Sequence, residues 1–233
     1  MSSERDKVYE GLLKKYEQII NHKLDRICLI DSGISKSNYI QKKFKKSFFN
    51  DKVISPHGEI VGKSIALYAS NDCFFYSFLA EKDYSDVIYK LYEAIDKGIN
   101  LINISMDTVI KINTEEGLRI YQKWKNAIKY ADSKKVTIVC SAGNYGINLD
   151  DIYPYMVIPA MFSTVITVGA LNSNYERADY SNFGTCVNEF IYGGDCLYPI
   201  KFKMDNGKNI NTFGTSISAG IFSGIISNIN KDG

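Results

Sequence analysis

The sequence predicts an α/β fold of three layers, in which a doubly wound, mostly parallel sheet carries helices on both faces. Short apolar runs alternate with helical runs of about ten to twenty residues, which is the pattern of βαβ units. The short runs are apolar throughout, as in strands of a parallel sheet that is covered on both faces. A chain of 233 residues can bury one large core, so we expect one main domain.

The first predicted element is an amphipathic helix over residues 1–22, ahead of a compact domain over residues 23–233. Its apolar side chains recur at the three- and four-residue spacing of one helix face. The helix either packs on the back of the domain or binds a partner, and packing is the favoured interpretation. The residues of this face are Val8, Leu12, Leu13, Tyr16, Ile19 and Ile20.

The domain is then predicted element by element. A strand over 27–30 ends at the turn Asp31-Ser32-Gly33, and a helix over 84–98 ends at a glycine, the residue preferred just after a helix. Ligands of such folds bind beyond the carboxyl ends of the strands, so the residues that follow each strand are candidates for function. The other elements are helix 59–68, strand 73–78, strand 99–105, helix 115–135, strand 136–144 and strand 164–171.

Composition excludes several classes of partner. The net charge of +2 gives no basic surface for nucleic acid, and no apolar run reaches the ~20 residues of a membrane span. The N-terminus lacks the apolar stretch of a secretory signal, so we expect a cytoplasmic protein. The basic cluster 41–49 is either a solvated loop, which we favour, or a contact for an acidic partner. Nothing in the sequence fixes the oligomeric state.

The cysteines predict neither a disulfide framework nor a metal site. Five is an odd number, and Cys28, Cys73 and Cys140 lie in apolar runs typical of buried thiols. Cys186 and Cys196 could pair, but a reduced state is expected in the cytoplasm. No spacing predicts a zinc site, and we expect no cofactor.

Three polar residues stand at the ends of predicted elements. Asp31 follows a strand, His57 precedes Gly58 at the start of a helix, and Ser216 opens an apolar helix. Each has an ordinary structural interpretation, as turn residue, structural histidine or helix cap. Together they supply what acyl transfer needs, because a serine hydroxyl requires a base and that base requires a third group to orient it.

The residues around these three positions resemble the motifs of the subtilisin-like serine proteases, in one consistent order. "ICLIDSGI" resembles the aspartate motif, "HGEIVGKSIA" the histidine motif and "FGTSISAGIFSG" the serine motif. "INLINIS" is similar to the strand that lines the substrate cleft, and "VTIVCSAGNYG" to the strand that carries the oxyanion-hole asparagine. The resemblance runs from Ile27 to Ile226 and implies a subtilisin-like fold.

The resemblance also implies roles and an activity. Ser216 would be the nucleophile, His57 the general base and then acid, and Asp31 the residue that orients His57. Asn144 would donate its amide to the oxyanion beside the backbone N–H of Ser216. The implied protein is a serine endopeptidase acting on peptides or proteins through an acyl-enzyme, with narrow specificity such as leader processing.

The implied substrate cleft differs from the family pattern. Ser105, Met106 and Asp107 replace most of a small, glycine-containing wall, and Val157 stands at the pocket floor. Asp107 either narrows an acidic pocket or points to solvent. The edge that pairs with extended substrate is compressed into residues 79–85, which indicates a modified groove.

Other departures favour a second hypothesis. Gly220 and Ile221 replace a proline and a histidine, Ile60 replaces a histidine, and Lys63 replaces a small residue. The triad remains, but the packing around it changes, so the alternative is a weak or inactive pseudoprotease that binds peptides or regulates a partner. A third hypothesis is a scaffolding subunit that uses the N-terminal helix or the basic cluster.

The last expectations concern maturation and metal. Many relatives carry a calcium loop after the catalytic histidine, whereas residues 69–73 offer too few oxygen ligands for one. No inhibitory prosegment is recognisable, so we expect activity in the chain as synthesised. The end of the chain soon after Ser216 fits either a minimal intracellular form or a shortened one.

Overall fold

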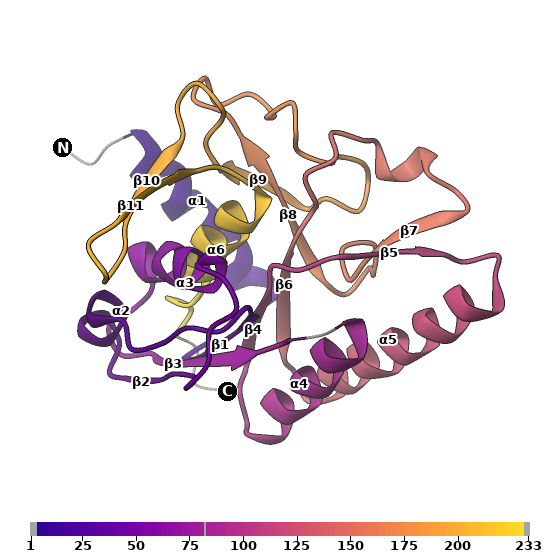
Figure 1. Cartoon of the computed structure of the whole chain (residues 1–233), viewed down its shortest axis with the longest axis horizontal. Coiled ribbons are helices and arrows are strands. Elements are labelled where there is room, and N and C mark those ends of the chain that lie inside the picture. The colour runs from indigo at the N-terminus through magenta and orange to yellow at the C-terminus, as the bar shows by residue number, and fades with distance from the viewer. Residues whose placement is uncertain (1–3, 82, 231–233) are drawn as a thin grey trace.

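A computed structural model describes residues 4–81 and 83–230, with side chains from residue 7 onward. Its centre is a seven-stranded sheet of order β2-β3-β1-β4-β6-β8-β9 in which every pairing is parallel (Figure 1). The predicted fold class is therefore confirmed. The strands are β1 (Arg26–Asp31), β2 (Lys46–Phe48), β3 (Phe74–Leu79), β4 (Leu101–Ile104), β6 (Thr137–Ser141), β8 (Ile166–Leu171) and β9 (Glu189–Tyr192).

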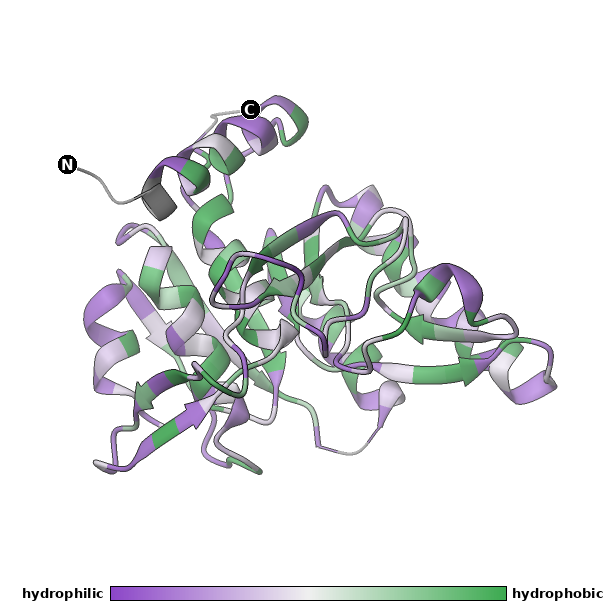
Figure 2. Ribbon diagram, turned by 90° about the horizontal axis from the view of Figure 1, so that it is seen from above, coloured by the Kyte–Doolittle hydropathy of each residue, from purple (hydrophilic) through white to green (hydrophobic). Residues whose placement is uncertain are grey.

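Helices cover both faces of this sheet. Figure 1 shows α4 (Tyr84–Asp96) and α5 (Glu115–Ser133) on one side, and α3 (His57–Tyr68) and α6 (Thr215–Ile226) on the other. In β1, Ile27 and Leu29 belong to the core beneath α3 and α6, while Cys28 and Ile30 belong to the core beneath α4 and α5. Both sets are buried, which explains why residues 27–30 of the strand are all apolar. In Figure 2 hydrophobic residues are concentrated along the strands that cross the middle of the molecule.

The two helices that carry His57 and Ser216 pack against each other through glycine. Every residue of α6 is buried. A Cβ at Gly220 would lie 2.9 Å from Cβ of Ser64, and one at Gly224 would lie 2.3 Å from the carbonyl oxygen of Ile65. Gly220, a departure from the family pattern, thus permits a close contact between α3 and α6.

The first helix, α1 (Glu4–Ile19), packs on the outer side of α6, as favoured above. The rings of Tyr16 and Phe222 meet edge to face with centroids 5.0 Å apart. The predicted face is wrong at two positions, because Val8 is 56% exposed and Ile19 67% exposed. Tyr16 and Ile20 of the predicted face are buried, Leu12 and Leu13 pack against the core, and Tyr9 joins them on the buried side. The domain boundary at residue 22 stays a prediction.

The long predicted elements are confirmed with shifted ends, and helix 59–68 begins two residues earlier, at His57. The basic cluster 41–49 is not simply a loop, because it contains the end of a helix and the edge strand β2. All five cysteines are free thiols. No helix among the described residues is long and apolar enough to cross a bilayer. The unpredicted elements are α2 (Asn38–Lys43), β2, β5 (Thr108–Lys111), η1 (Leu149–Asp151), β7 (Tyr155–Ile158), β9, β10 (Ile200–Lys203) and β11 (Asn209–Thr212).

Candidate active site

Asp31 and His57 meet at the carboxyl end of β1. The Nδ1 atom of His57 lies 2.8 Å from Oδ1 and 3.0 Å from Oδ2 of Asp31, which is only 1% exposed. The backbone N–H of Ser32 also donates to Oδ1 of Asp31, at 2.6 Å. A carboxylate can only accept, so Nδ1 carries the proton and Nε2 is free to accept one.

The environment of His57 favours its protonated form. Burial lowers the pKa of the imidazole, while the hydrogen bond and the negative charge of Asp31 raise it, and the net pKa is raised. An imidazolium formed next to Asp31 is therefore stabilised, as general base catalysis requires.

Glycine and serine bring the two residues together. A Cβ at Gly33, where φ is +83°, would lie 2.6 Å from the carbonyl oxygen of Lys52, and one at Gly58 would lie 2.6 Å from that of Gly33. Oγ of Ser32 accepts from the N–H of Gly58 at 2.9 Å and donates to the carbonyl oxygen of Ser55 at 3.1 Å. The close contact between the end of β1 and the start of α3 therefore depends on the Asp-Ser-Gly and His-Gly sequences.

Ser216 lies in the first turn of α6 and is 8% exposed. The helix is preceded by Gly214 at φ 154° and ψ 159°, a conformation open almost only to glycine. Oγ of Ser216 donates to the carbonyl oxygen of Ser105 at 3.4 Å. Among the described residues it makes no hydrogen bond with His57, although such bonds often form only when substrate binds.

Asn144 is oriented by Thr215, the residue before Ser216. Its Oδ1 accepts from the backbone N–H of Thr215 at 2.9 Å and from the hydroxyl at 3.0 Å. A backbone N–H can only donate, so Nδ2 of Asn144 is left as a donor, and it has no acceptor within the described residues. The N–H of Ser216 belongs to the first turn of a helix, where such groups lack intrahelical acceptors. Both donors are thus available to an anion.

The loop that carries Asn144 is held by a residue that we did not predict. Nδ2 of Asn182 donates to the carbonyl oxygen of Ala142 at 2.8 Å, and its Oδ1 accepts from the N–H groups of Tyr145 at 3.0 Å and Ile147 at 3.3 Å. Asn182 is fully buried. A buried side-chain amide needs such hydrogen-bond partners, but the amino-acid sequence alone does not show which residues they are.

The predicted cleft residues lie in two different environments. The Ser105 hydroxyl donates to Oδ1 of Asn103 at 2.8 Å, so its side chain faces inward. Met106 is packed against the core beneath α4 and α5, and Val157 is 1% exposed on β7. Their role in a pocket stays a prediction.

Asp107 is half-buried beside the loop of Asn144. Its Oδ2 would lie 3.1 Å from a Cβ at Gly143, and its carboxylate is hydrogen-bonded to the hydroxyl of Tyr145. Burial raises the pKa of Asp107, and the hydrogen bond of Tyr145 opposes this only in part. Asp107 therefore faces the loop that carries Asn144. In residues 4–81 and 83–230 no cluster of His, Cys, Asp and Glu could hold a metal ion.

Comparison with known sequences agrees with the resemblance. The family model described as "Subtilase family" matches residues 26–231. An intracellular serine protease of Paenibacillus polymyxa is 27% identical over 58% of this chain and 37% of its own length. A thermophilic serine proteinase of Bacillus sp. (strain AK1) is 31% identical over 50% of this chain and 25% of its own. The nisin leader peptide-processing serine protease NisP of Lactococcus lactis subsp. lactis is 27% identical over 56% of this chain and 22% of its own length. The matched parts are thus well under half the length of these relatives.

Solved structures share the fold. A lanthipeptide protease superimposes with a TM-score of 0.77 at 21% identity, over 93% of this chain and 80% of that one. The epidermin leader peptide processing serine protease EpiP of Staphylococcus aureus superimposes with a TM-score of 0.69 at 20% identity, over 91% of this chain and 66% of that one. NisP superimposes with a TM-score of 0.69 at 19% identity, over 91% of this chain and 78% of that one. At these identities the likeness is one of fold.

Proposed function

The chain belongs to the subtilase family, and from this premise we propose that it is a serine endopeptidase that cleaves peptide bonds through an acyl-enzyme. The observation that carries the proposal is the hydrogen bond between His57 Nδ1 and the buried carboxylate of Asp31, at 2.8 Å. This hydrogen bond leaves Nε2 free to act as a base at the carboxyl ends of the strands, where the first turn of α6 also lies.

Acylation would begin with a rotation of the Ser216 side chain from the carbonyl oxygen of Ser105 toward His57. Oγ then attacks the substrate carbonyl carbon while Nε2 of His57 takes the hydroxyl proton. Asp31 keeps its charge throughout and stabilises the imidazolium.

The tetrahedral oxyanion would be bound by Nδ2 of Asn144 and the N–H of Ser216. Donors already in place at the developing charge need little reorganisation, and the positive end of α6 adds to them. The protonated His57 then gives its proton to the leaving amine. A water molecule, deprotonated by His57, attacks the acyl-enzyme and releases Ser216.

We further propose narrow specificity, with a peptide or leader as substrate, and a cytoplasmic location. The half-buried carboxylate of Asp107 beside the oxyanion loop supports a restricted pocket. Two of the similar proteins are named as leader peptide-processing proteases, and a third as an intracellular protease. No nucleic-acid partner is proposed.

A second candidate function is an inactive, peptide-binding subtilase. The observation that favours it is the Ser216 hydroxyl, which donates to Ser105 and not to His57. A fluorophosphonate probe separates the two, since labelling requires an activated serine. We expect wild type to be labelled at Ser216 and Ser216→Ala to stay unlabelled. Binding of peptides without any labelling of the wild type would establish the second function.

A further inference from the structure

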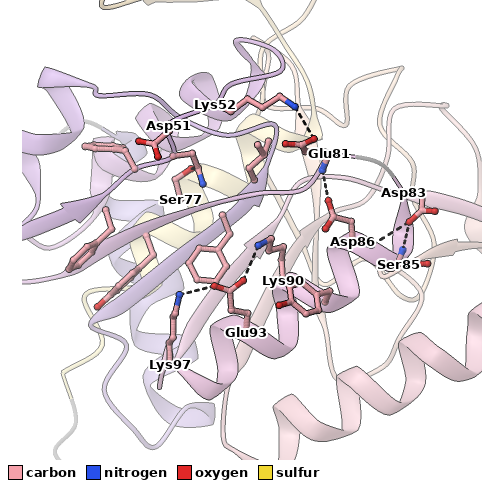
Figure 3. Close-up of a pocket in the computed structure, with 17 residues that line it drawn as sticks. Asp51, Lys52, Ser77, Glu81, Asp83, Ser85, Asp86, Lys90, Glu93 and Lys97 are labelled. Atoms are coloured by element: carbon pink, nitrogen blue, oxygen red, sulfur yellow. Dashed lines mark hydrogen bonds and ion pairs between the residues drawn. The ribbon is translucent and has the colours of Figure 1, made fainter.

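A groove of about 1160 Å³ lies between the outer strands of the sheet, β2 and β3, and the side of α4 (Figure 3). It arises because α4 packs into the core over β1, so this face of the two outer strands is left partly open. We call it the β2–β3 groove. One wall comes from residues 48–52 and 76–79, and the other from Glu81 and from the exposed side of the α4 region, between Asp83 and Lys97.

The floor of the β2–β3 groove is aromatic. The rings of Phe48 and Tyr76 stack with centroids 4.6 Å apart, and Phe48 is 38% exposed. The Nζ atom of Lys97 lies 4.9 Å from the ring centroid of Phe78. Such a floor suits the side chains of a peptide, which stack on aromatic faces or cover them with alkyl stems.

The lysines that line the groove are already paired. Lys52 forms an ion pair with Glu81 at 2.9 Å. Glu93 forms ion pairs with both Lys90, at 2.9 Å, and Lys97, at 2.7 Å (Figure 3). Their charges are therefore largely compensated within the groove.

The carboxylates are in excess. Five of them line the groove against three lysines, and Asp51, Asp83 and Asp86 have no ion-pair partner within the described residues, to which Lys82 does not belong. Asp83 accepts from the N–H of Ser85 at 2.8 Å, and Asp86 accepts from that of Glu81. Figure 3 shows Asp83 and Asp86 together at the end of the groove near Glu81, with Asp51 on the opposite wall, so this acidic end carries negative charge that a cationic ligand would complement.

This acidic end adjoins the catalytic residues. Leu79 lies opposite Asp31 in the register of β1 and β3, and the N–H of Ala80 donates to the carbonyl oxygen of Asp31 at 2.9 Å. The strand on the other side of β1, β4, leads into the segment of Asp107. A peptide that lay along the ends of β3 and β4 would therefore pass close to both Asp31 and Glu81.

We propose that the β2–β3 groove binds the part of the substrate that precedes the scissile bond, as an extended segment with basic side chains at Asp51, Asp83 and Asp86 and an apolar one over Phe48 and Tyr76. The inference rests on the proposed function, since it assigns the substrate of that same site. It names a cationic segment upstream of the cleaved bond as the recognised feature.

The test compares two peptides that share the residues around a bond cleaved by the wild-type chain. One carries lysines in the upstream segment and the other carries glutamates there. We expect the wild type to prefer the lysine peptide, and the preference in kcat/KM to fall about three- to tenfold in Asp51→Asn/Asp86→Asn, as for loss of two exposed ion pairs. Asparagine keeps an acceptor for the N–H of Glu81. The matched control, Glu115→Gln/Asp132→Asn, removes two exposed charges from α5 and should keep the preference.

Fluorescence anisotropy on full-length Ser216→Ala separates this proposal from the proposed function. The labelled lysine peptide should bind it more tightly than the glutamate peptide, and adding Asp51→Asn/Asp86→Asn should remove the difference. That binding preference, together with a wild type that cleaves neither peptide, would support the groove and reject the proposed protease. Equal affinity of the two peptides, or a preference that survives the double substitution, would overturn the groove whatever the activity.

Discussion

Nδ1 of His57 lies 2.8 Å from Oδ1 of Asp31. The two residues are 26 positions apart, and the contact depends on the close approach of Gly58 to Gly33. The imidazole of His57 is therefore oriented by the fold itself, as the proposed general base would require.

The first prediction concerns pH. Hydrolysis requires neutral His57, whose pKa is raised above its ordinary value of 6.5 by Asp31, so kcat/KM should fall as pH drops through this raised value. Asp31→Asn removes both influences that raise the pKa and leaves burial, which lowers it. The acid limb should then move to lower pH, with kcat/KM down about 10⁴-fold because the ring loses its tautomer and orientation. An acid limb at the same pH in both proteins would show that another group controls it.

The second prediction concerns Ser216 and His57. Replacement of either residue by alanine should lower kcat by about 10⁶-fold, the loss known for a subtilisin. The double variant should lose hardly more, because the two residues act as a unit. Ser216 Oγ makes one long hydrogen bond, at 3.4 Å to Ser105, so Ser216→Ala should melt near the wild-type temperature. Calorimetry and single-turnover assays check both points. Turnover close to wild type in either single variant would contradict the triad.

Sequence reasoning succeeded where local patterns carry the structure. β1, β4 and β6 are mainly apolar because both faces of the sheet are covered, and α4 ends just before Gly98. It failed for β10 and β11, whose alternation of polar and apolar residues is short and whose pairing depends on the hairpin itself. Asp31, His57 and Ser216 stand in motifs, whereas Asn182 acts through partners about 40 positions away in the chain. Long-range hydrogen bonds leave no periodic pattern in a sequence.

The third prediction concerns Asn144. Asn144→Ala should lower kcat by about 10²–10³-fold with little change in KM, because the amide meets negative charge mainly in the transition state; the magnitude comes from a subtilisin. Alanine also removes the acceptor of Thr215. Asn144→Asp is a second variant, since it keeps that acceptor and replaces the donor by a negatively charged oxygen. It should be at least as slow as alanine. A rise confined to KM would instead place Asn144 in substrate binding.

The fourth prediction concerns Lys63, a departure from the family pattern. Its Nζ, in a residue only 5% exposed, donates to the carbonyl oxygen of Lys203 at 2.6 Å and pairs with Glu59 at 2.7 Å and Asp205 at 3.2 Å. It therefore ties the β10–β11 hairpin to the helix that begins at His57. Lys63→Met would leave two carboxylates without their cation and should cost about 3–5 kcal/mol in urea unfolding. The exposed Lys201→Met, on the same hairpin, should change stability by less than about 0.5 kcal/mol.

The same ion pairs predict how stability depends on pH. Burial raises the pKa of Asp205, but the N–H of Asn38 and the charge of Lys63 outweigh it, so the pKa lies below its ordinary value of 3.8. A lowered pKa stabilises the fold at pH above 3.8, and this contribution is lost as pH falls through the lower folded value. In Lys63→Met the loss of stability on acidification should be smaller. An unchanged slope would mean that Lys63 contributes little to the state of Asp205.

The last prediction concerns Asp107 as a specificity residue. If its carboxylate lines the pocket for the residue before the scissile bond, lysine or arginine should be preferred there over leucine. Asp107→Ser should reduce that preference by about 10- to 100-fold, as expected for loss of a hydrogen bond to a charged group. Because burial raises the pKa of Asp107, the preference should already weaken at a pH where an exposed aspartate is still charged.

Tyr145→Phe supplies the matched control for Asp107. The hydroxyl of Tyr145 lowers the pKa of Asp107, so its removal should raise that pKa further and shift the loss of preference to higher pH. Cleavage of lysine and leucine peptides across a pH series measures the shift, and His57 affects both peptides alike, so the ratio isolates Asp107. A ratio that is flat with pH in the wild type, and unchanged in Asp107→Ser, would place Asp107 outside the specificity pocket.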